Sequence, residues 1–177
     1  KTADYVSEVP TSMYINGSAF GGEKWDWSFD TIVEMTPVNG AEGSFWAVRY
    51  LPADSEFKFS ETRDWDGHNF GLDENGNESG SNCKVTEAGL YLFVINATPE
   101  GVTGYVKPAT VCGLGDAFGG WDATNAGQVA MTVNADGTAS VTATASGVLR
   151  AFAKIEGVDA WKSEFSNWFV TDAALYY

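Results

Sequence analysis

Tryptophan and lysine residues recur in this chain at one fixed spacing. Trp25, Lys58 and Trp65 are each followed, 96 residues later, by Trp121, Lys154 and Trp161. An indole offers a flat apolar face on which the C–H face of a sugar ring can pack, and a lysine ammonium can donate hydrogen bonds to sugar hydroxyls. The repeated set therefore predicts a glycan-binding site in each half of the chain.

A buried tryptophan is also a common core residue of a β-sandwich, so we expect at least one tryptophan of each pair to be structural. Three further tryptophans have no repeated partner, and they are additional candidates either for glycan contact or for the core: Trp27, Trp46 and Trp168.

The chain offers little that would support catalysis. His68 is the single histidine, and no nucleophile, zinc or phosphate-loop motif surrounds it. A glycosidase needs two carboxylates that flank the bond, and Asp64 with Asp66 would be such a pair. The second half has Ala160 and Lys162 at the corresponding positions. We therefore expect a binding protein with no catalytic residues, not an enzyme.

Metal and cofactor sites are not predicted either. The segment 73–77 carries oxygen-bearing side chains at alternate positions, as calcium loops do, but it lacks the spacing of an EF-hand. Its Asn75–Gly76 pair favours an ordinary hairpin turn. Two cysteines, Cys83 and Cys112, are too few for a disulfide framework or a closed zinc site, and we expect free or buried thiols.

The charge of the chain narrows the range of partners. It has 24 acidic and 10 basic residues, which gives a formal net charge of −14. Such a field repels nucleic acid, anionic membranes and polyanionic sugars, whereas a neutral polysaccharide or oligosaccharide is indifferent to it.

Further landmarks predict that the chain is a tandem repeat. The segment 19–22 (Ala-Phe-Gly-Gly) recurs at 117–120, and Met35–Thr36 recurs as Met131–Thr132. We therefore predict a linker or leader over 1–11, a first module over 12–107 and a second module over 108–177. The second module is shorter by the equivalent of 85–107.

Each module is predicted to consist of β-strands. Aromatic and β-branched residues crowd the segments 44–51, 56–59 and 89–95, and 138–144 alternates with a period of two. Asn-Gly and Asp-Gly turns separate such runs, and neither a helical period nor a membrane-spanning apolar stretch is present. The expected fold class is all-β, with two tandem β-sandwich modules.

Several stretches resemble one known family. The phrases MYINGSAFGGEKWDW, VCGLGDAFGGWD, ADSEFKFSETRDWDGHNFG and KVTEAGLYLFVINAT are similar to the tandem modules of SusE/SusF-type outer-membrane lipoproteins of Bacteroidetes. The resemblance implies surface-exposed β-sandwich modules that hold starch or a related glycan, without catalysis or cofactor, for neighbouring outer-membrane glycan-uptake proteins. It also implies aromatic platforms with Lys or Arg at the positions Trp25, Lys58, Trp65, Trp121, Lys154 and Trp161.

The chain departs from this family in some respects. Members of the family commonly carry a lipid-bearing N-terminal cysteine and an immunoglobulin-like stalk, and we expect neither within these 177 residues; Asp116 stands where the first module has Ser18. The alternative function is a structural or adhesive spacer whose repeated tryptophans all lie in the core. Exposure of Trp65 and Trp161 beside their lysines would favour glycan binding over the spacer.

Overall fold

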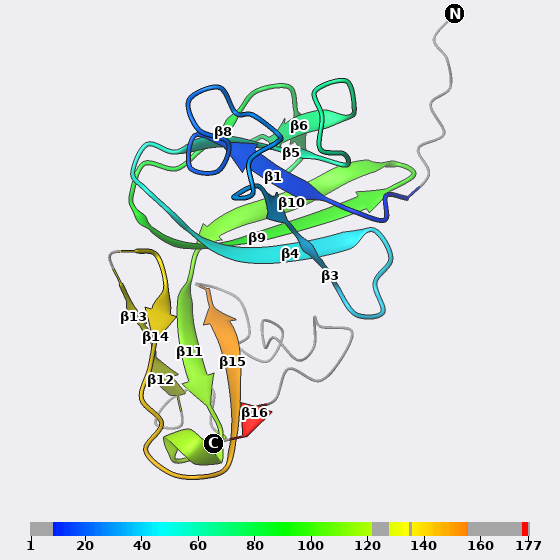
Figure 1. Ribbon diagram of the computed structural model, residues 1–177. Helices are drawn as coiled ribbons and strands as arrows, with labels where there is room; N and C mark the ends of the chain where they lie inside the picture. The colour runs from blue at the N-terminus through cyan, green and yellow to red at the C-terminus, as the bar shows by residue number, and fades with distance from the viewer. Residues whose placement is uncertain (1–8, 122–127, 135, 156–174, 177) are drawn as a thin grey trace, which may run out of the picture.

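The computed structural model describes residues 9–121, 128–134, 136–155 and 175–176 (Figure 1). Over these ranges the chain forms antiparallel strands and one short 3-10 helix, η1 (Asp116–Phe118). The all-β class predicted from the sequence is thereby confirmed. No helix in the described part of the chain is long and apolar enough to cross a bilayer.

The first module is a sandwich of two antiparallel sheets. One sheet has the strand order β2–β1–β5–β6–β7, with β8 also paired to β5; the other has the order β10–β9–β4–β3. The bounds in the first sheet are β1 (Tyr14–Gly17), β2 (Val33–Glu34), β5 (Glu56–Ser60), β6 (Asn69–Leu72), β7 (Glu78–Ser79) and β8 (Cys83–Lys84). Those in the second are β3 (Thr36–Pro37), β4 (Ser44–Leu51), β9 (Gly89–Thr98) and β10 (Gly101–Pro108).

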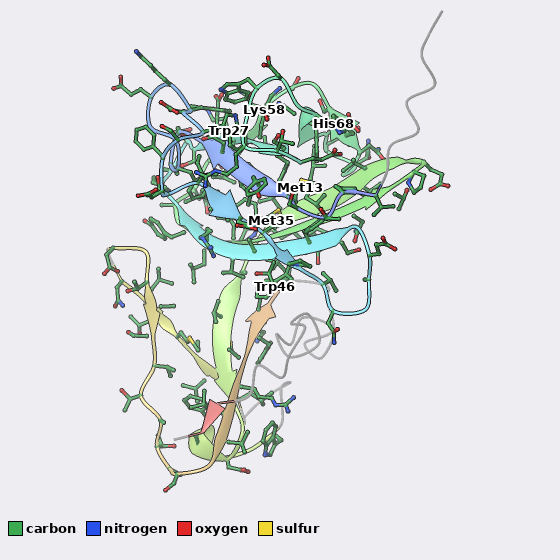
Figure 2. The ribbon with its side chains drawn as sticks, turned by 45° about the vertical axis from the view of Figure 1, so that its right-hand side comes forward. Met13, Trp27, Met35, Trp46, Lys58 and His68 are labelled. Atoms are coloured by element: carbon green, nitrogen blue, oxygen red, sulfur yellow. The ribbon has the colours of Figure 1, made fainter. Side chains whose placement is uncertain are left out.

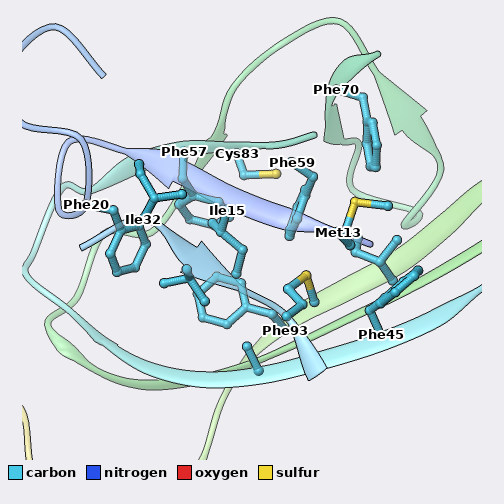
Figure 3. Close-up of a cluster of buried hydrophobic side chains, with 14 of the residues drawn as sticks. Met13, Ile15, Phe20, Ile32, Phe45, Phe57, Phe59, Phe70, Cys83 and Phe93 are labelled. Carbon is cyan, nitrogen blue, oxygen red and sulfur yellow. The ribbon is translucent and has the colours of Figure 1, made fainter. Parts of the chain in front are cut away.

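The core of this module lies between the two sheets (Figure 3). Phe57 and Phe59 on β5 are both buried, and they meet Phe93 of the opposite sheet with ring centroids 5.4 and 6.4 Å away. Because successive side chains of a strand point to opposite faces, Lys58 between them faces outward. Burying each phenylalanine contributes about 1.5–3 kcal/mol, so the core that fixes β5 also fixes the direction of Lys58.

The second module repeats the strand order of the first. Its sheet runs β12–β11–β15–β16, in the manner of β2–β1–β5–β6, and β13 pairs with β14 as β3 pairs with β4. The bounds are β11 (Thr110–Leu114), β12 (Gln128–Ala130), β13 (Thr132–Val133), β14 (Ala139–Ser140), β15 (Val148–Lys154) and β16 (Leu175–Tyr176).

The Met35 and Met131 landmarks of the repeat occupy matching positions in the two modules. The amide of Met35 donates to the carbonyl of Met13, and the amide of Met131 donates to the carbonyl of Val111, each at 2.8 Å. β10 ends at Pro108 and β11 begins at Thr110, next to the predicted boundary between 107 and 108. The exact division into modules stays a prediction.

The two modules touch through a small apolar contact. Alternate residues of β4 face opposite ways: Phe45 enters the sandwich core, whereas Trp46 packs with Leu92 against Ala153 and Ile155 of the second module. Figure 2 shows Trp46 directed from β4 toward β15. Trp46 is only 5% exposed. The prediction that Trp46 is a further glycan contact is therefore corrected, because the Trp46 ring is enclosed between the modules.

Candidate functional site

Three of the predicted residues come together on the first module. Trp25, Lys58 and Trp65 line one open hollow of about 320 Å³, together with Glu23, Lys24 and Asn82. The ring centroids of Trp25 and Trp65 lie 6.5 Å apart, and the ring planes are tilted by 32°. Trp65 is 48% exposed, which is unusual for so large an apolar side chain. The hollow thus joins two indole faces with an ammonium group.

Trp25 is held in place by a buried asparagine. The Asn16 side chain is fully buried and donates to the carbonyl of Trp25 at 2.7 Å. Trp25 itself adopts a φ of 52°, a left-handed conformation that non-glycine residues rarely take. Gly21 makes room for this arrangement, since a Cβ there would stand 2.1 Å from the Asn16 Oδ1. The orientation of Trp25 is therefore built into the loop that follows β1.

Trp65 lies on the loop between β5 and β6, and the Trp27 ring packs against it from the side of the core. The rings of Trp27 and Trp65 meet edge to face, with centroids 5.4 Å apart. Trp27 is only 7% exposed and belongs to the sandwich core. The prediction of Trp27 as a further glycan contact is corrected: this side chain supports Trp65, and its own faces are covered.

Lys58 contributes the polar edge of the hollow. Its Nζ donates to the carbonyl of Gly80 at 2.7 Å, which uses one of the three ammonium donors. Beside it, the Asn82 amide donates to a carboxylate oxygen of Glu56 at 3.0 Å. Fixed donors and acceptors at the rim of an aromatic surface are suited to orienting a polyhydroxylated ligand.

The second module exposes one of its predicted tryptophans. Trp121 is 40% exposed, and its indole Nε1 donates to the Asp116 carboxylate at 2.8 Å. The guanidinium carbon of Arg150 lies 5.8 Å from the centre of the Trp121 ring, within range of a cation–π contact. Trp161 and Trp168 lie outside the described residues.

The predicted equivalence of Lys58 and Lys154 is wrong. On β5, Lys58 lies opposite Asn16; at the corresponding place in the second module, Arg150 lies opposite Leu114. Lys154 lies opposite Thr110, four residues further along β15 and therefore about 13 Å away. The structure thus brings Arg150, not Lys154, to Trp121. The constant sequence offset failed here because β15 is slid by four residues against β11.

Larger hollows occur elsewhere in the described chain. One of about 610 Å³ lies by the β6–β7 turn, β8 and β10, and one of about 530 Å³ lies beside His68. The first contains the Tyr105 ring, but the Nζ of Lys107 already lies over that ring, 5.3 Å from its centre. We favour the smaller hollow as the site, because it presents the exposed ring faces on which a sugar ring can pack. The two larger hollows offer more volume but no comparable aromatic surface.

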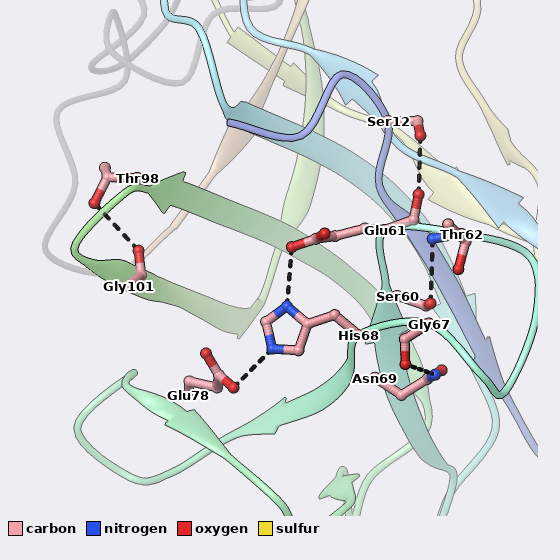
Figure 4. A network of polar contacts seen from close by, with 10 residues as sticks. All are labelled: Ser12, Ser60, Glu61, Thr62, Gly67, His68, Asn69, Glu78, Thr98 and Gly101. Carbon is pink, nitrogen blue, oxygen red and sulfur yellow. Dashed lines mark hydrogen bonds and ion pairs between the residues drawn. The ribbon is translucent and has the colours of Figure 1, made fainter. Parts of the chain in front are cut away.

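A histidine joins the Trp65 loop to β7. One ring nitrogen of His68 lies 2.9 Å from Glu61 Oε1, and the other lies 2.8 Å from Glu78 Oε1 (Figure 4). Burial opposes the charged ring, but the hydrogen bonds and charges of the two glutamates outweigh it and raise the pKa of His68. A doubly protonated ring donates to both carboxylates, so this contact is complete only when His68 is charged.

The acidic segment 73–77 forms a turn. The Asp73 carboxylate accepts hydrogen bonds from the amides of Asn75 and Asn77, as in an ordinary hairpin. Among the described residues, no group of three or more His, Cys, Asp or Glu side chains is arranged to hold a metal ion. Cys83 and Cys112 are free and buried, and burial raises the pKa of both thiols.

Sequence reasoning missed several residues of these arrangements. Asn16 gave no signal, because a polar residue in a strand is ordinarily expected to face solvent. Glu23, Lys24 and Asn82 come from loops whose path the sequence does not specify. The sequence gives no signal for Arg150, because the pairing of β15 with β11 that places this residue is set by the fold.

An open aromatic surface on an antiparallel sandwich is the arrangement of a carbohydrate-binding module. The model of the SusF/SusE family, described as starch-specific carbohydrate-binding modules, matches residues 12–105. The chain belongs to this family. It is 32% identical over 182 residues to the outer membrane protein SusF of Bacteroides thetaiotaomicron, a match that covers 90% of this chain and 36% of that protein.

The fold is similar as well. The crystal structure of SusF from Bacteroides thetaiotaomicron superposes with a TM-score of 0.71 at 26% sequence identity, over 96% of this chain and 44% of that one. The chain therefore spans less than half the length of these relatives.

Proposed function

We propose that this chain binds a neutral glucan of the starch type without cleaving it. The observation that carries the proposal is the pair Trp25 and Trp65: two accessible indoles, tilted by 32°, with Lys58 at their edge. Consecutive sugar rings of a coiled α-glucan turn relative to one another. Two tilted faces therefore suit such a chain better than the flat ribbon of a β-linked glucan.

The second module offers a smaller site of similar chemistry. Trp121 provides one ring face, and Arg150 provides guanidinium donors beside it. We propose that this pair holds a second segment of the same polymer. Two weak sites on one chain raise the apparent affinity for a long polymer, since the second contact becomes intramolecular.

Family membership supports this proposal, and so does the net charge. The family is described as starch-specific, and a similar protein is named an outer membrane protein. We accordingly place this chain at the outer membrane, exposed at the cell surface, where it would hold polysaccharide beside other glycan-uptake proteins. A net charge of −14 is compatible with a neutral ligand and unfavourable for a uronic-acid polymer.

A structural or adhesive spacer is the second candidate. It would require the repeated tryptophans to serve as core residues, as Trp27 and Trp46 do. The exposure of Trp65 and Trp121 favours binding over this alternative.

The test is affinity gel electrophoresis against soluble starch, followed by calorimetry with a linear maltooligosaccharide. We expect the 177-residue chain to be retarded and to release no reducing ends. A variant with both Trp65→Ala and Trp121→Ala should lose the retardation. Phe29→Ala is the matched control, because Phe29 is 45% exposed but does not line the hollow. Absence of binding to any neutral glucan would refute the proposal.

A further inference from the structure

Arg63 links the two loops of the first module that carry Trp25 and Trp65. It lies two residues before Trp65, and its Nη2 donates to the carbonyl of Trp27 at 2.8 Å and to the carbonyl of Phe29 at 2.9 Å. Both carbonyls belong to the loop that also carries Trp25. Hydrogen bonds from a charged guanidinium are stronger than neutral ones and are fixed in direction by its planar fork.

Other contacts hold each loop separately. Within the 61–68 loop, the amide of Gly67 donates to the Asp64 carboxylate at 2.6 Å. In the first loop, Asn16 donates to the Trp25 carbonyl. These bonds shape each loop, but they do not set the distance between the two. The Arg63 hydrogen bonds and the contacts of the Trp65 ring with Trp25 and Trp27 cross from one loop to the other.

We propose that Arg63 is a positioning residue, which fixes the tilt between Trp25 and Trp65 and so completes the binding surface before the glycan arrives. This inference rests on the proposed function of that surface. Arg63 does not line the hollow, so it acts through the indoles and not by touching the sugar. A surface already ordered in the free protein binds more tightly, because binding need not restrict the loop.

The variant Arg63→Met keeps an unbranched apolar stem and removes the guanidinium donors. Without them the Trp65 loop can move relative to the Trp27 carbonyl, and the ligand must order it. We expect the Kd for a maltooligosaccharide to rise about threefold to thirtyfold, which lies within the range of coupling energies that contacting residues show. Arg63→Lys retains a donor and should recover part of the affinity.

A double-mutant cycle with Trp65→Ala separates positioning from direct contact. In a Trp121→Ala background, which isolates the site of the first module, Arg63→Met should change the Kd little once Trp65 is already alanine if Arg63 acts through Trp65. If Arg63 touches the glycan, the two losses should add. The circular dichroism couplet of the neighbouring indoles should weaken in Arg63→Met alone. Lys107→Met, which removes a positive charge from the other sheet, is the control and should leave the Kd unchanged.

The outcomes distinguish this inference from the proposed function. If Trp65→Ala leaves oligosaccharide affinity intact, the proposed site is wrong. If Trp65→Ala weakens binding while Arg63→Met, folded by its melting curve, leaves both the Kd and the indole couplet unchanged, the role assigned to Arg63 is wrong. Additive losses would also overturn it. A weakened couplet with a nonadditive loss of affinity supports it.

Discussion

Arg150 lies opposite Leu114 in the β11–β15 ladder, at the place where Lys58 lies opposite Asn16 in the first module. The cation beside Trp121 is therefore Arg150, whereas the sequence spacing predicted Lys154. Lys154 lies about 13 Å further along the same strand. The two cations of β15 can therefore be tested against each other.

With the first module weakened by Trp65→Ala, Arg150→Met should further reduce binding to starch, whereas Lys154→Met should not. The expected loss is about 0.5–2 kcal/mol, since a guanidinium beside an aromatic face contributes both a cation–π contact and hydrogen-bond donors. Affinity gel electrophoresis of the three variants measures it. A loss confined to Lys154→Met would contradict this prediction and would support the equivalence of Lys154 and Lys58 that the offset of 96 residues predicts.

The hydrogen bond from Trp121 to Asp116 leads to a second prediction. Asp116→Ala removes the acceptor that fixes the indole, whereas Asp116→Asn keeps an oxygen at the same place. In the Trp65→Ala background, the alanine variant should bind glucan more weakly by about 0.5–1.5 kcal/mol, and the asparagine variant should be nearly normal. Calorimetry measures both affinities. Equal losses in the two variants would point to a direct role of the carboxylate charge.

How far the sequence predicts this structure depends on the type of residue. The alternation Phe57–Lys58–Phe59 is decided by the strand period, so burial of the phenylalanines and the outward lysine followed from local pattern alone. The tryptophans are different: Trp27 and Trp65 are in ring contact, yet one is buried and the other is half exposed. Nothing local separates them, because loop packing decides which face remains open.

The mistake about Lys154 has a physical origin. Matching identical residues assumes that the loops have equal length, whereas hydrogen bonding between strands decides which residues lie opposite each other. β11 and β12 keep the predicted offsets, with Gly113 opposite Val129 as Ile15 is opposite Val33. β15 does not keep them. A slip of four residues preserves the face of the strand but changes the neighbour, which is why the error leaves the alternation intact.

His68 should make stability depend on pH. Its pKa in the folded protein is raised above 6.5, mainly through Glu61 and Glu78 acting against burial, with Asp66 and Glu100 also lining the adjacent hollow. A group with a raised folded pKa stabilises the protein below its unfolded pKa and loses that contribution as pH rises through the folded value.

The variant His68→Gln should therefore lower the melting temperature at about pH 5.5 and have a smaller effect at about pH 8.5. Because His68 is the single histidine of the chain, its titration can be followed by NMR without overlap. Glu78→Gln, which removes one carboxylate, should lower the pKa of the ring. Equal destabilisation by His68→Gln at both pH values would show that its charge does not matter.

Trp46 and Trp65 should respond to truncation in opposite ways. Trp46→Ala opens a cavity between the modules and removes contacts with Leu92, Ala153 and Ile155, so the free energy of unfolding should fall by about 3–5 kcal/mol. Trp65→Ala removes a half-exposed ring, so stability should change far less while binding falls by about 1–3 kcal/mol.

Thermal melts and calorimetry on the same two variants measure both quantities. The Trp46 variant should keep its affinity for a short oligosaccharide, because the ring lies on the outer face of the β10–β9–β4–β3 sheet and the hollow lies on the other sheet. Its affinity for long starch chains should nevertheless decline, since loosening the contact between modules lowers the effective concentration of the second site. Loss of short-oligosaccharide binding in a folded Trp46→Ala variant would contradict this prediction and would make Trp46 a glycan contact.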